Sequence, residues 1–253
     1  MVRKKVALIF IGTGKYLDFL EDWKKSIDSY FMNDCEKNIF VFSDLEPKEP
    51  GVIHTEVPKW IWPEASLYRF KMMLKVKEQL EKHDYIFYID SDLFAQQEIH
   101  SSEIIEKDTT LVGVHHPGNF VNPDWYTWED SKDSLAYVPG KLSDYGEKAV
   151  YFQGCFWGGK SENVLELCEN LDAAIDEDLS KGIMAKWIDE SHLNKYFLDR
   201  LDEVKIMPFN YAFPEQEQFR HLVTFHPMKF MHVEKSHEEY FYGLESNSTS
   251  KKG

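Results

Sequence analysis

Two aspartates near the middle of the chain, Asp90 and Asp92, directly follow an apolar run at residues 85–89. Aromatic and β-branched residues favour an extended conformation, in which alternate side chains share a face, so the two carboxylates can converge on one point. Carboxylate oxygens suit Mg²⁺ or Mn²⁺, which commonly keep open positions for the oxygens of a diphosphate. A polar strand end or an Asx turn is the alternative, because aspartate often makes both. The spacing alone leaves both interpretations open.

A glycine-rich turn at residues 12–16, Gly-Thr-Gly-Lys-Tyr, follows the apolar run 5–11. It matches neither common phosphate-binding motif, because Tyr16 stands where a P-loop needs Ser or Thr and the dinucleotide pattern lacks its third glycine. A ligand can still approach the backbone closely at a glycine, although a tight turn without a ligand is an equal alternative. Tyr16 could stack on a nucleotide base or pack into the core beside the first helix.

The length and charge of the chain narrow its class. Its 253 residues are 43% hydrophobic, which is enough to bury a large core, and α/β architectures of this length often form one domain. The formal net charge of −15 argues against a nucleic-acid partner, since Lys and Arg side chains hold such partners by their phosphates. An anionic substrate would therefore need a divalent cation and a few local basic side chains.

Cysteine content and hydropathy bear on the cellular compartment. Cys35, Cys155 and Cys168 match neither a zinc site nor a disulfide framework, which favours a reducing environment. The apolar run 6–11 is too short to span a membrane, and no cleavage pattern follows it. We expect a soluble, cytoplasmic protein with no membrane span.

Apolar runs and amphipathic segments alternate in the first third of the chain. Strands are expected at 5–11, 38–42 and 85–89, and helices at 17–31 and 66–82. Strands that alternate with helices indicate an α/β fold with a mostly parallel sheet, whose ligands bind beyond the carboxyl ends of the strands.

The second half of the chain is less regular. Residues 117–148 are rich in Pro, Gly, Asp and aromatic residues, and we expect them to form a long excursion that walls a substrate site. Ser161 is expected to cap one helix, and another helix is expected to begin near Asp189. No linker divides the chain, so we expect one domain over 1–245 and a disordered tail over 246–253.

Two long motifs do not follow the periodicity of a core element. They are Tyr-Phe-Gln-Gly-Cys-Phe-Trp-Gly-Gly at 151–159 and Trp-Ile-Asp-Glu-Ser-His-Leu-Asn-Lys-Tyr at 187–196. Together with the Asp-x-Asp pair, His-Pro-Gly at 116–118 and Ala-Tyr-Val-Pro at 136–139, they resemble the family 6 retaining glycosyltransferases, the family of the blood-group A and B transferases and the α-1,3-galactosyltransferases. The likeness covers roughly residues 5–240 and implies a GT-A fold with a Rossmann-like nucleotide-binding half.

The resemblance implies a donor site for a UDP-sugar. The residues that fall on the family's donor-binding positions are Ile11, Gly12, Thr13, Tyr16, Arg69, Asp90, Asp92, Gln153, Gly154, Cys155, Asp189 and Lys235. Asp90 and Asp92 match the pair that binds Mn²⁺, with Mg²⁺ as an alternative, and Lys235 matches a lysine that clamps the diphosphate. The family's second C-terminal cation, an arginine, has no counterpart, because the aligned position lies near Phe241.

Glu190 matches the family's catalytic acid, which acts as a nucleophile or stabilises an oxocarbenium-like transition state, and Asp189 matches the acid that holds the donor sugar. Retention needs a negative charge opposite the leaving group, which agrees with this assignment. Taken alone, the same two residues would be a helix N-cap and an acid favoured by the helix dipole. Ile188 stands where the family has a His that helps to order the sugar site.

The family's acceptor-binding positions are matched by His116, Thr127, Trp187 and Glu190. The two aromatic residues have an ordinary structural alternative, since His and Trp are often simply packed in the core. Residues 129–131, Glu-Asp-Ser, lack the two arginines of the family's Thr-Tyr-Glu-Arg-Arg stretch, so a blood-group-type acceptor is not implied.

These observations predict a metal-dependent hexosyltransferase of the EC 2.4.1 type. It would move galactose or N-acetylgalactosamine from UDP to a hydroxyl of an acceptor glycan and form an α-1,3 linkage. The alternatives are a nucleotide-sugar hydrolase and a non-catalytic module that binds glycans or nucleotide sugars. Gln153 and Cys155 fall where the galactose and N-acetylgalactosamine enzymes differ, and the second position is Gly in the A transferase and Ala in the B transferase. Cys is bulkier than either residue and would fill the space that an acetamido group needs. UDP-galactose is therefore the expected donor.

Overall fold

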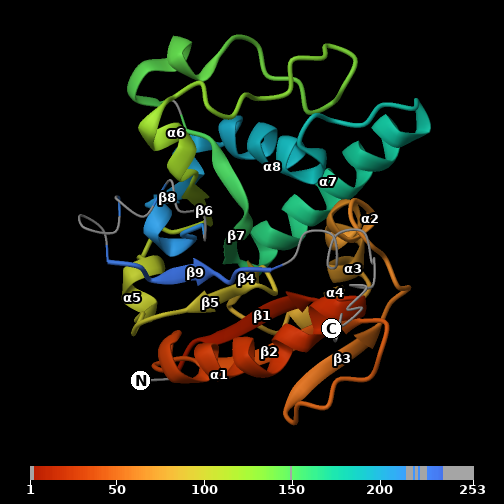
Figure 1. Cartoon of the computed structure of the whole chain (residues 1–253), viewed down its shortest axis with the longest axis vertical. Coiled ribbons are helices and arrows are strands. Elements are labelled where there is room, and N and C mark those ends of the chain that lie inside the picture. Colours follow the sequence, from red (N-terminus) through yellow and green to blue (C-terminus); the bar gives the residue numbers. More distant parts are fainter. Residues whose placement is uncertain (1–2, 149, 215–218, 220–221, 223–226, 236–253) are drawn as a thin grey trace, which may run out of the picture.

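A seven-stranded sheet runs through the part of the chain that the structure describes, residues 3–148, 150–214, 219, 222 and 227–235. The computed structural model orders its strands β3-β2-β1-β4-β7-β6-β8 (Figure 1). They are β1 (Lys5–Ile11), β2 (Glu36–Ser43), β3 (Val52–Glu56), β4 (Tyr85–Ile89), β6 (Leu111–His115), β7 (Phe152–Lys160) and β8 (Val204–Met207). A separate pair joins β5 (Leu93–Ala95) to β9 (Phe230–His232). The tail predicted at 246–253 lies outside the described residues.

Parallel pairing dominates this sheet. β1 pairs in parallel with β2 and β4, β2 with β3, and β6 with β8, whereas β7 is antiparallel to β4 and β6. The predicted strands at 5–11, 38–42 and 85–89 are confirmed, and so is the α/β class with a mostly parallel sheet. β3 is absent from the sequence prediction because its residues are only partly buried and show no apolar alternation.

Helices pack on both faces of the sheet (Figure 1). They are α1 (Leu20–Tyr30), α2 (Glu64–Leu67), α3 (Arg69–Leu74), α4 (Lys77–Leu80), α5 (Ser101–Ile104), α6 (Pro117–Val121), α7 (Ser161–Ser180) and α8 (Ile188–Leu198), with short 3₁₀ turns at Gly14–Phe19 (η1), Leu142–Lys148 (η2), Leu201–Glu203 (η3) and Phe209–Tyr211 (η4). Within the described residues, none of these helices has the length and apolar character needed to cross a membrane.

Two of the predicted helices are interrupted. The segment 17–31 starts within η1 and becomes α-helical only in α1. The segment 66–82 is split into α2, α3 and α4, because Tyr68 and Val76 leave the α-helical region of φ and ψ. The break at Tyr68 puts Arg69 at the start of α3, where its side chain is buried.

The long helices of the second half start close to the predicted positions. Lys160 occupies the N-cap of α7, so Ser161 is the first helical residue rather than the cap. Trp187 occupies the N-cap of α8, which places both Asp189 and Glu190 in the first helical turn. The helix dipole favours acidic side chains at that position.

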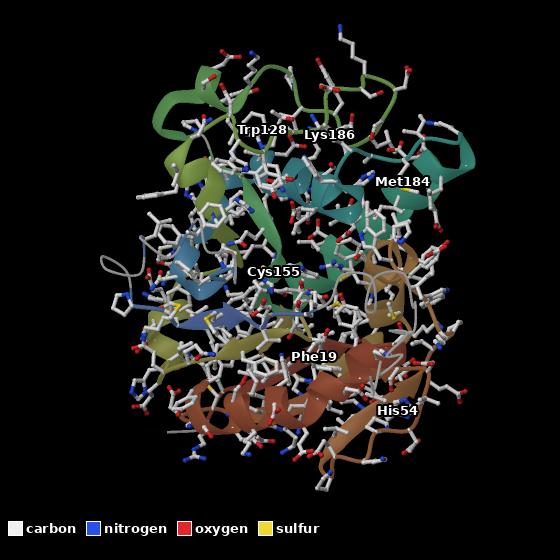
Figure 2. The ribbon with its side chains drawn as sticks, viewed as in Figure 1. Phe19, His54, Trp128, Cys155, Met184 and Lys186 are labelled. Atoms are coloured by element: carbon white, nitrogen blue, oxygen red, sulfur yellow. The ribbon has the colours of Figure 1, made fainter. Side chains whose placement is uncertain are left out.

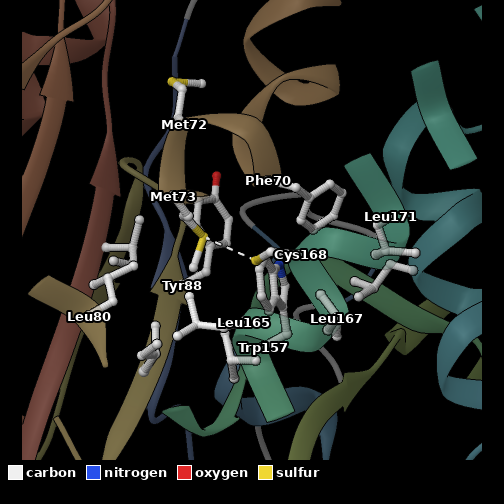
Figure 3. Close-up of a cluster of buried hydrophobic side chains, with 14 of the residues drawn as sticks. Phe70, Met72, Met73, Leu80, Tyr88, Trp157, Leu165, Leu167, Cys168 and Leu171 are labelled. Carbon is white, nitrogen blue, oxygen red and sulfur yellow. Dashed lines mark hydrogen bonds between the residues drawn. The ribbon is translucent and has the colours of Figure 1, made fainter. Parts of the chain in front are cut away.

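The core has two layers, one on each face of the sheet. Alternate side chains of β1 enter different layers: Ala7 and Ile9 pack with α3 and α7, and Leu8 and Phe10 pack with α1. This two-sided burial explains why β1 is continuously apolar. Figure 3 shows part of the first layer, where Phe70, Tyr88, Trp157 and Cys168 meet between β4, β7 and α7.

The motif at 151–159, which periodicity left unexplained, is largely strand β7. Its residues are buried on both faces between β4 and β6, so the strand shows no alternation. A Cβ atom on Gly158 would lie 2.3 Å from the carbonyl oxygen of Ile86, which means that the close packing of β7 on β4 requires glycine there.

The excursion at 117–148 crosses the end of the molecule above α7 and α8 (Figure 1). Apart from α6 and η2 it is irregular, as predicted. The buried carboxylate of Asp178 on α7 anchors it, accepting hydrogen bonds from Ser134 Oγ at 2.6 Å and from the Leu135 backbone nitrogen at 3.0 Å. These bonds hold an irregular segment over the N-terminal end of α8.

We predict that Gly158→Ala lowers the free energy of unfolding by about 1–3 kcal/mol, because the added methyl group overlaps backbone atoms of β4. Urea unfolding followed by circular dichroism measures the change. The exposed control Lys107→Ala should stay within about 0.5 kcal/mol of the parent. Equal stability of the Gly158 variant and the control would contradict the packing described here.

Candidate active site

A cavity of about 250 Å³ opens at the carboxyl ends of β1 and β4. Seven of the predicted donor-binding residues line it: Ile11, Thr13, Tyr16, Arg69, Asp90, Asp92 and Lys235. The cavity is also lined by Lys59, Trp60 and Trp62, which the sequence did not indicate. A larger hollow of about 830 Å³ lies at the amino end of β4 and contains none of the predicted site residues, so the smaller cavity is the candidate site.

Asp90 and Asp92 lie in a turn directly after β4, closed by a 3.0 Å bond from the Leu93 nitrogen to the Asp90 carbonyl oxygen. The extended run predicted at 85–89 is strand β4, and the two aspartates that follow it both line the cavity, as expected. Asp90 Oδ1 accepts a 2.5 Å hydrogen bond from the Tyr88 hydroxyl. Asp92 forms an ion pair with Lys235, and its Oδ1 lies 3.4 Å from His232 Nδ1.

The strand pair β5–β9 brings Lys235 to this cavity. The Val233 nitrogen donates a 2.9 Å hydrogen bond to the Asp92 carbonyl oxygen, just beyond the end of β9. The Lys235 ammonium also lies 5.5 Å from the centre of the Tyr16 ring. Residues 143 positions apart in sequence thus meet at one wall of the cavity.

The donor set of the site fits a hard divalent cation. Two carboxylates, Asp90 and Asp92, face one cavity and could bind such an ion together with diphosphate oxygens and water. Within the described residues, no group of three or more His, Cys, Asp or Glu side chains could hold a metal by itself. The protein would therefore supply only part of the ligand set, and a bound diphosphate the rest.

Arg69 connects this cavity to the start of α8. Its Nη1 donates a 2.6 Å hydrogen bond to the Gly154 carbonyl oxygen, and its Nε lies 2.9 Å from Asp189 Oδ2. The guanidinium also stacks over the Tyr88 ring at 4.6 Å and lies 4.0 Å from Asp90 Oδ1. Burial lowers the pKa of Arg69, but the neighbouring charges, with Asp189 foremost, raise it above its usual value, so the cation is retained.

The backbone is strained at Ile188, the first residue of α8, whose φ of 55° is unusual for a β-branched residue. Asp189 and Glu190 follow it directly. Burial raises the pKa of Asp189 to about 6 against the opposing effect of Arg69. Asp189 Oδ2 has no partner with hydrogen-bond geometry within the described residues, despite its ion pair with Arg69. That oxygen is itself buried, so its charge is met by the neighbouring Arg69 guanidinium rather than by solvent.

Glu190 is held by two donors. Its Oε1 accepts a 2.7 Å hydrogen bond from the Tyr151 hydroxyl, and its Oε2 accepts a 2.6 Å bond from the Gly154 nitrogen. Burial raises the pKa of Glu190 to about 7, and the two hydrogen bonds oppose that rise. A Cβ atom on Gly154 would lie 3.1 Å from Oε2, so glycine gives this carboxylate room.

The predicted acceptor residues gather around Tyr126. Its ring centre lies 4.2 Å from that of His116 and 5.0 Å from that of Trp187. Trp187 Nε1 donates a 2.9 Å hydrogen bond to the Thr127 carbonyl oxygen. Tyr151 adjoins the same group, with its ring 5.5 Å from that of Tyr126. We call His116, Tyr126, Tyr151 and Trp187 the aromatic wall; through the Tyr151 hydroxyl it contacts Glu190. Burial lowers the pKa of His116 to about 3, which keeps it neutral.

Three of the predicted donor residues lie behind the cavity lining. Gln153 donates from Nε2 to the carbonyl oxygens of His115 and Ala212, at 3.2 and 3.1 Å. Cys155 is buried next to Gln153, and burial raises the pKa of its thiol. A Cβ atom on Gly12 would lie 2.5 Å from the Phe10 ring, so packing alone already requires a glycine there.

A known protein family matches most of the chain. The model of the family "Glycosyltransferase family 6" matches residues 2–240. The chain belongs to glycosyltransferase family 6. It is an enzyme of the sugar-transferring class, and its sheet and helices form the GT-A fold of that family.

This chain is similar to three relatives, and the matches cover different shares of their lengths. The O-antigen biosynthesis glycosyltransferase WbnI of Escherichia coli is 31% identical, over 83% of this chain and 88% of its own length. A globoside α-1,3-N-acetylgalactosaminyltransferase of Gallus gallus is 31% identical, and a histo-blood group ABO system transferase of Rattus norvegicus 29%; each match covers 76% of this chain. The chain spans only 57% and 59% of those two animal proteins.

Some site residues escaped the sequence prediction. Tyr88 stands two positions before Asp90, an alternation that could have indicated its contact with the carboxylate. Tyr151 opens a motif that was recognised, but nothing local links it to Glu190, 39 positions later. Trp60 and Trp62 lie in a segment without periodicity, where the sequence gives no signal.

We predict that kcat/KM for the donor rises with pH with an apparent pKa near 7, because Glu190 must lose its proton to act as an anion. Tyr151→Phe removes a hydrogen bond that lowers this pKa, so the rising limb of the profile should shift to higher pH by about one unit. Tyr145→Phe, whose hydroxyl binds the Pro139 carbonyl oxygen, is the matched control and should leave the profile in place. A Tyr151→Phe profile that coincides with the parent's would argue against Glu190 as the titrating group.

Proposed function

We propose that the protein transfers galactose from UDP-galactose to a hydroxyl of an acceptor glycan with retention at the anomeric carbon, forming an α-1,3 linkage. The observation that carries this proposal is the position of Arg69, which contacts the Asp90 cavity on one side and Asp189 on the other. A diphosphate in the cavity would place its sugar beside Asp189 and Glu190. UDP-N-acetylgalactosamine is the alternative donor.

The donor half binds and neutralises the diphosphate. Asp90 and Asp92 would hold Mn²⁺ or Mg²⁺, which supplies charge stabilisation to the leaving diphosphate when bound. Lys235 lines the same cavity, as do Lys59 and Arg69, and these cations supply local positive charge in a protein whose net charge is −15. Tyr16 and Trp60 present aromatic rings at the cavity for contact with the uracil base.

The sugar half performs the transfer. Asp189 would hold the donor sugar's hydroxyls, and the Glu190 carboxylate would face the anomeric carbon as nucleophile or as a stabilising charge. The bond from the anomeric carbon to the diphosphate oxygen breaks, and UDP departs with the bonding electrons. The acceptor oxygen forms the new bond, and its proton leaves to the released phosphate. The aromatic wall around Tyr126 holds the acceptor glycan.

An assay with UDP-galactose and a panel of galactose-terminated acceptors tests this function. Nuclear magnetic resonance of the product should show a new α-linked galactose on a 3-hydroxyl. A β-linked product would exclude the retaining assignment. Free galactose as the sole product with every acceptor would instead support a nucleotide-sugar hydrolase, and tight donor binding without turnover would support a binding module.

We predict that UDP release requires a divalent cation. Excess chelator should abolish it, and added Mn²⁺ should restore it. Asp92→Asn should lower kcat by at least about 100-fold, because the charge of the leaving group is no longer neutralised. The control Asp199→Asn removes an exposed carboxylate that pairs with Lys195 and should respond to Mn²⁺ as the parent does. Full activity of the parent in chelator would refute the metal assignment.

We predict that the parent enzyme prefers UDP-galactose and that Cys155→Gly shifts the preference towards UDP-N-acetylgalactosamine. Steric effects of one or two heavy atoms are worth about 1–3 kcal/mol, or roughly 10–200-fold in the ratio of kcat/KM values. Gln153 is held by two carbonyl groups and should not move into the freed space. A parent that uses UDP-N-acetylgalactosamine better, with one acceptor at matched concentrations, would show that side-chain size does not set the donor.

A further inference from the structure

Lys186 is an exposed residue between α7 and α8 that the transfer chemistry leaves without a role. Its ammonium donates a hydrogen bond to Thr127 Oγ1, and its backbone nitrogen donates one of 2.5 Å to Glu129 Oε2. Trp187, the next residue, donates from Nε1 to the Thr127 carbonyl oxygen. These three bonds fix the lysine next to the aromatic wall. Figure 2 shows it near Trp128, at the end of the molecule that the excursion covers.

The charge of this lysine is not balanced by a neighbour. Among the residues that the structure describes, no carboxylate oxygen lies within 4.0 Å of the Lys186 ammonium, whose partner is the Thr127 hydroxyl. Glu129 is 4% exposed, and its two carboxylate oxygens accept hydrogen bonds from the backbone nitrogens of Ser131 and Lys186. By contrast, the exposed Lys181 on the same connection pairs with Glu177 at 2.6 Å. Lys186 thus presents a cation in an acidic protein.

Trp187 offers a surface on which a sugar can stack beside this cation. Trp187 is 36% exposed, and its ring packs against that of Tyr126. Aromatic rings of this kind combine apolar contact area with a polar edge, which suits the faces of a glycan. Because Lys186 and Trp187 both contact Thr127, a sugar stacked on Trp187 would lie close to the lysine.

We propose that the acceptor glycan carries an anionic group, a carboxylate or a phosphate ester, on the sugar next to the one that receives galactose, and that Lys186 binds this group. The inference rests on the proposed transferase function of the site. A single exposed ion pair contributes modestly, so the expected preference for an acidic over a neutral acceptor is about fivefold. The preference should shrink as salt screens the pair.

Binding of three probes tests this inference without the need for turnover. They are lactose, lactose with its glucose unit oxidised to glucuronic acid, and lactose phosphorylated on the glucose unit. The indole N–H signal of Trp187, assigned with Trp187→Phe, reports the dissociation constant of each probe with UDP and Mn²⁺ present. The variants are Lys186→Gln, Lys186→Arg and, as a matched control, Lys181→Gln. The two acidic probes distinguish a carboxylate from a phosphate ester.

The parent, Lys186→Arg and Lys181→Gln should bind at least one acidic probe about fivefold more tightly than lactose, and Lys186→Gln should bind the probes equally. Equal binding of all probes by the parent overturns the proposal, as does an acidic preference that survives in Lys186→Gln or a Trp187 signal that no probe perturbs. UDP release from UDP-galactose by the same parent preparation reports the transferase function separately. If no UDP is released, the transferase function itself is contradicted. If UDP is released but the parent shows no preference for acidic probes, only the role of Lys186 is contradicted.

Discussion

The buried guanidinium of Arg69 is the contact on which the geometry of the site depends. It lies 2.9 Å from Asp189 and 4.0 Å from Asp90, so it joins the carboxyl end of β4 to the first turn of α8. A buried charge is tolerated only when it is paired and hydrogen-bonded, and here carboxylates and the Gly154 carbonyl oxygen provide both. The cation also allows acidic side chains to approach one another in a desolvated pocket.

Strand β7 supplies the second constraint. Its glycines permit close contacts on two sides: Gly158 packs on β4, and Gly154 leaves space for Glu190. The same strand therefore belongs to the core and to the active site, and a substitution in it alters both. The excursion that Asp178 anchors brings Tyr126 and Thr127 against Trp187, at the start of α8.

The sequence predicts most of the elements that hold the site, but few of its contacts. β1 and β4 are recognisable because two-sided burial makes them continuously apolar, and the motif at 187–196 identifies the family. The split at Tyr68 escapes prediction because the amphipathic pattern continues across it. The bonds of Tyr151 to Glu190 and of Lys186 to Thr127 join residues 39 and 59 positions apart, and only the folded chain brings them together.

A double-mutant cycle on Arg69 and Asp189 tests most directly whether one buried ion pair unites the two halves of the site. The rate of UDP release from UDP-galactose would be measured for Arg69→Met, Asp189→Asn and the double variant. Each single change leaves a buried partner uncompensated, so the double variant should lose little more than the worse single variant, with a coupling of at least about 1.5 kcal/mol. Losses that simply add would show that the two residues act independently, and would contradict this account.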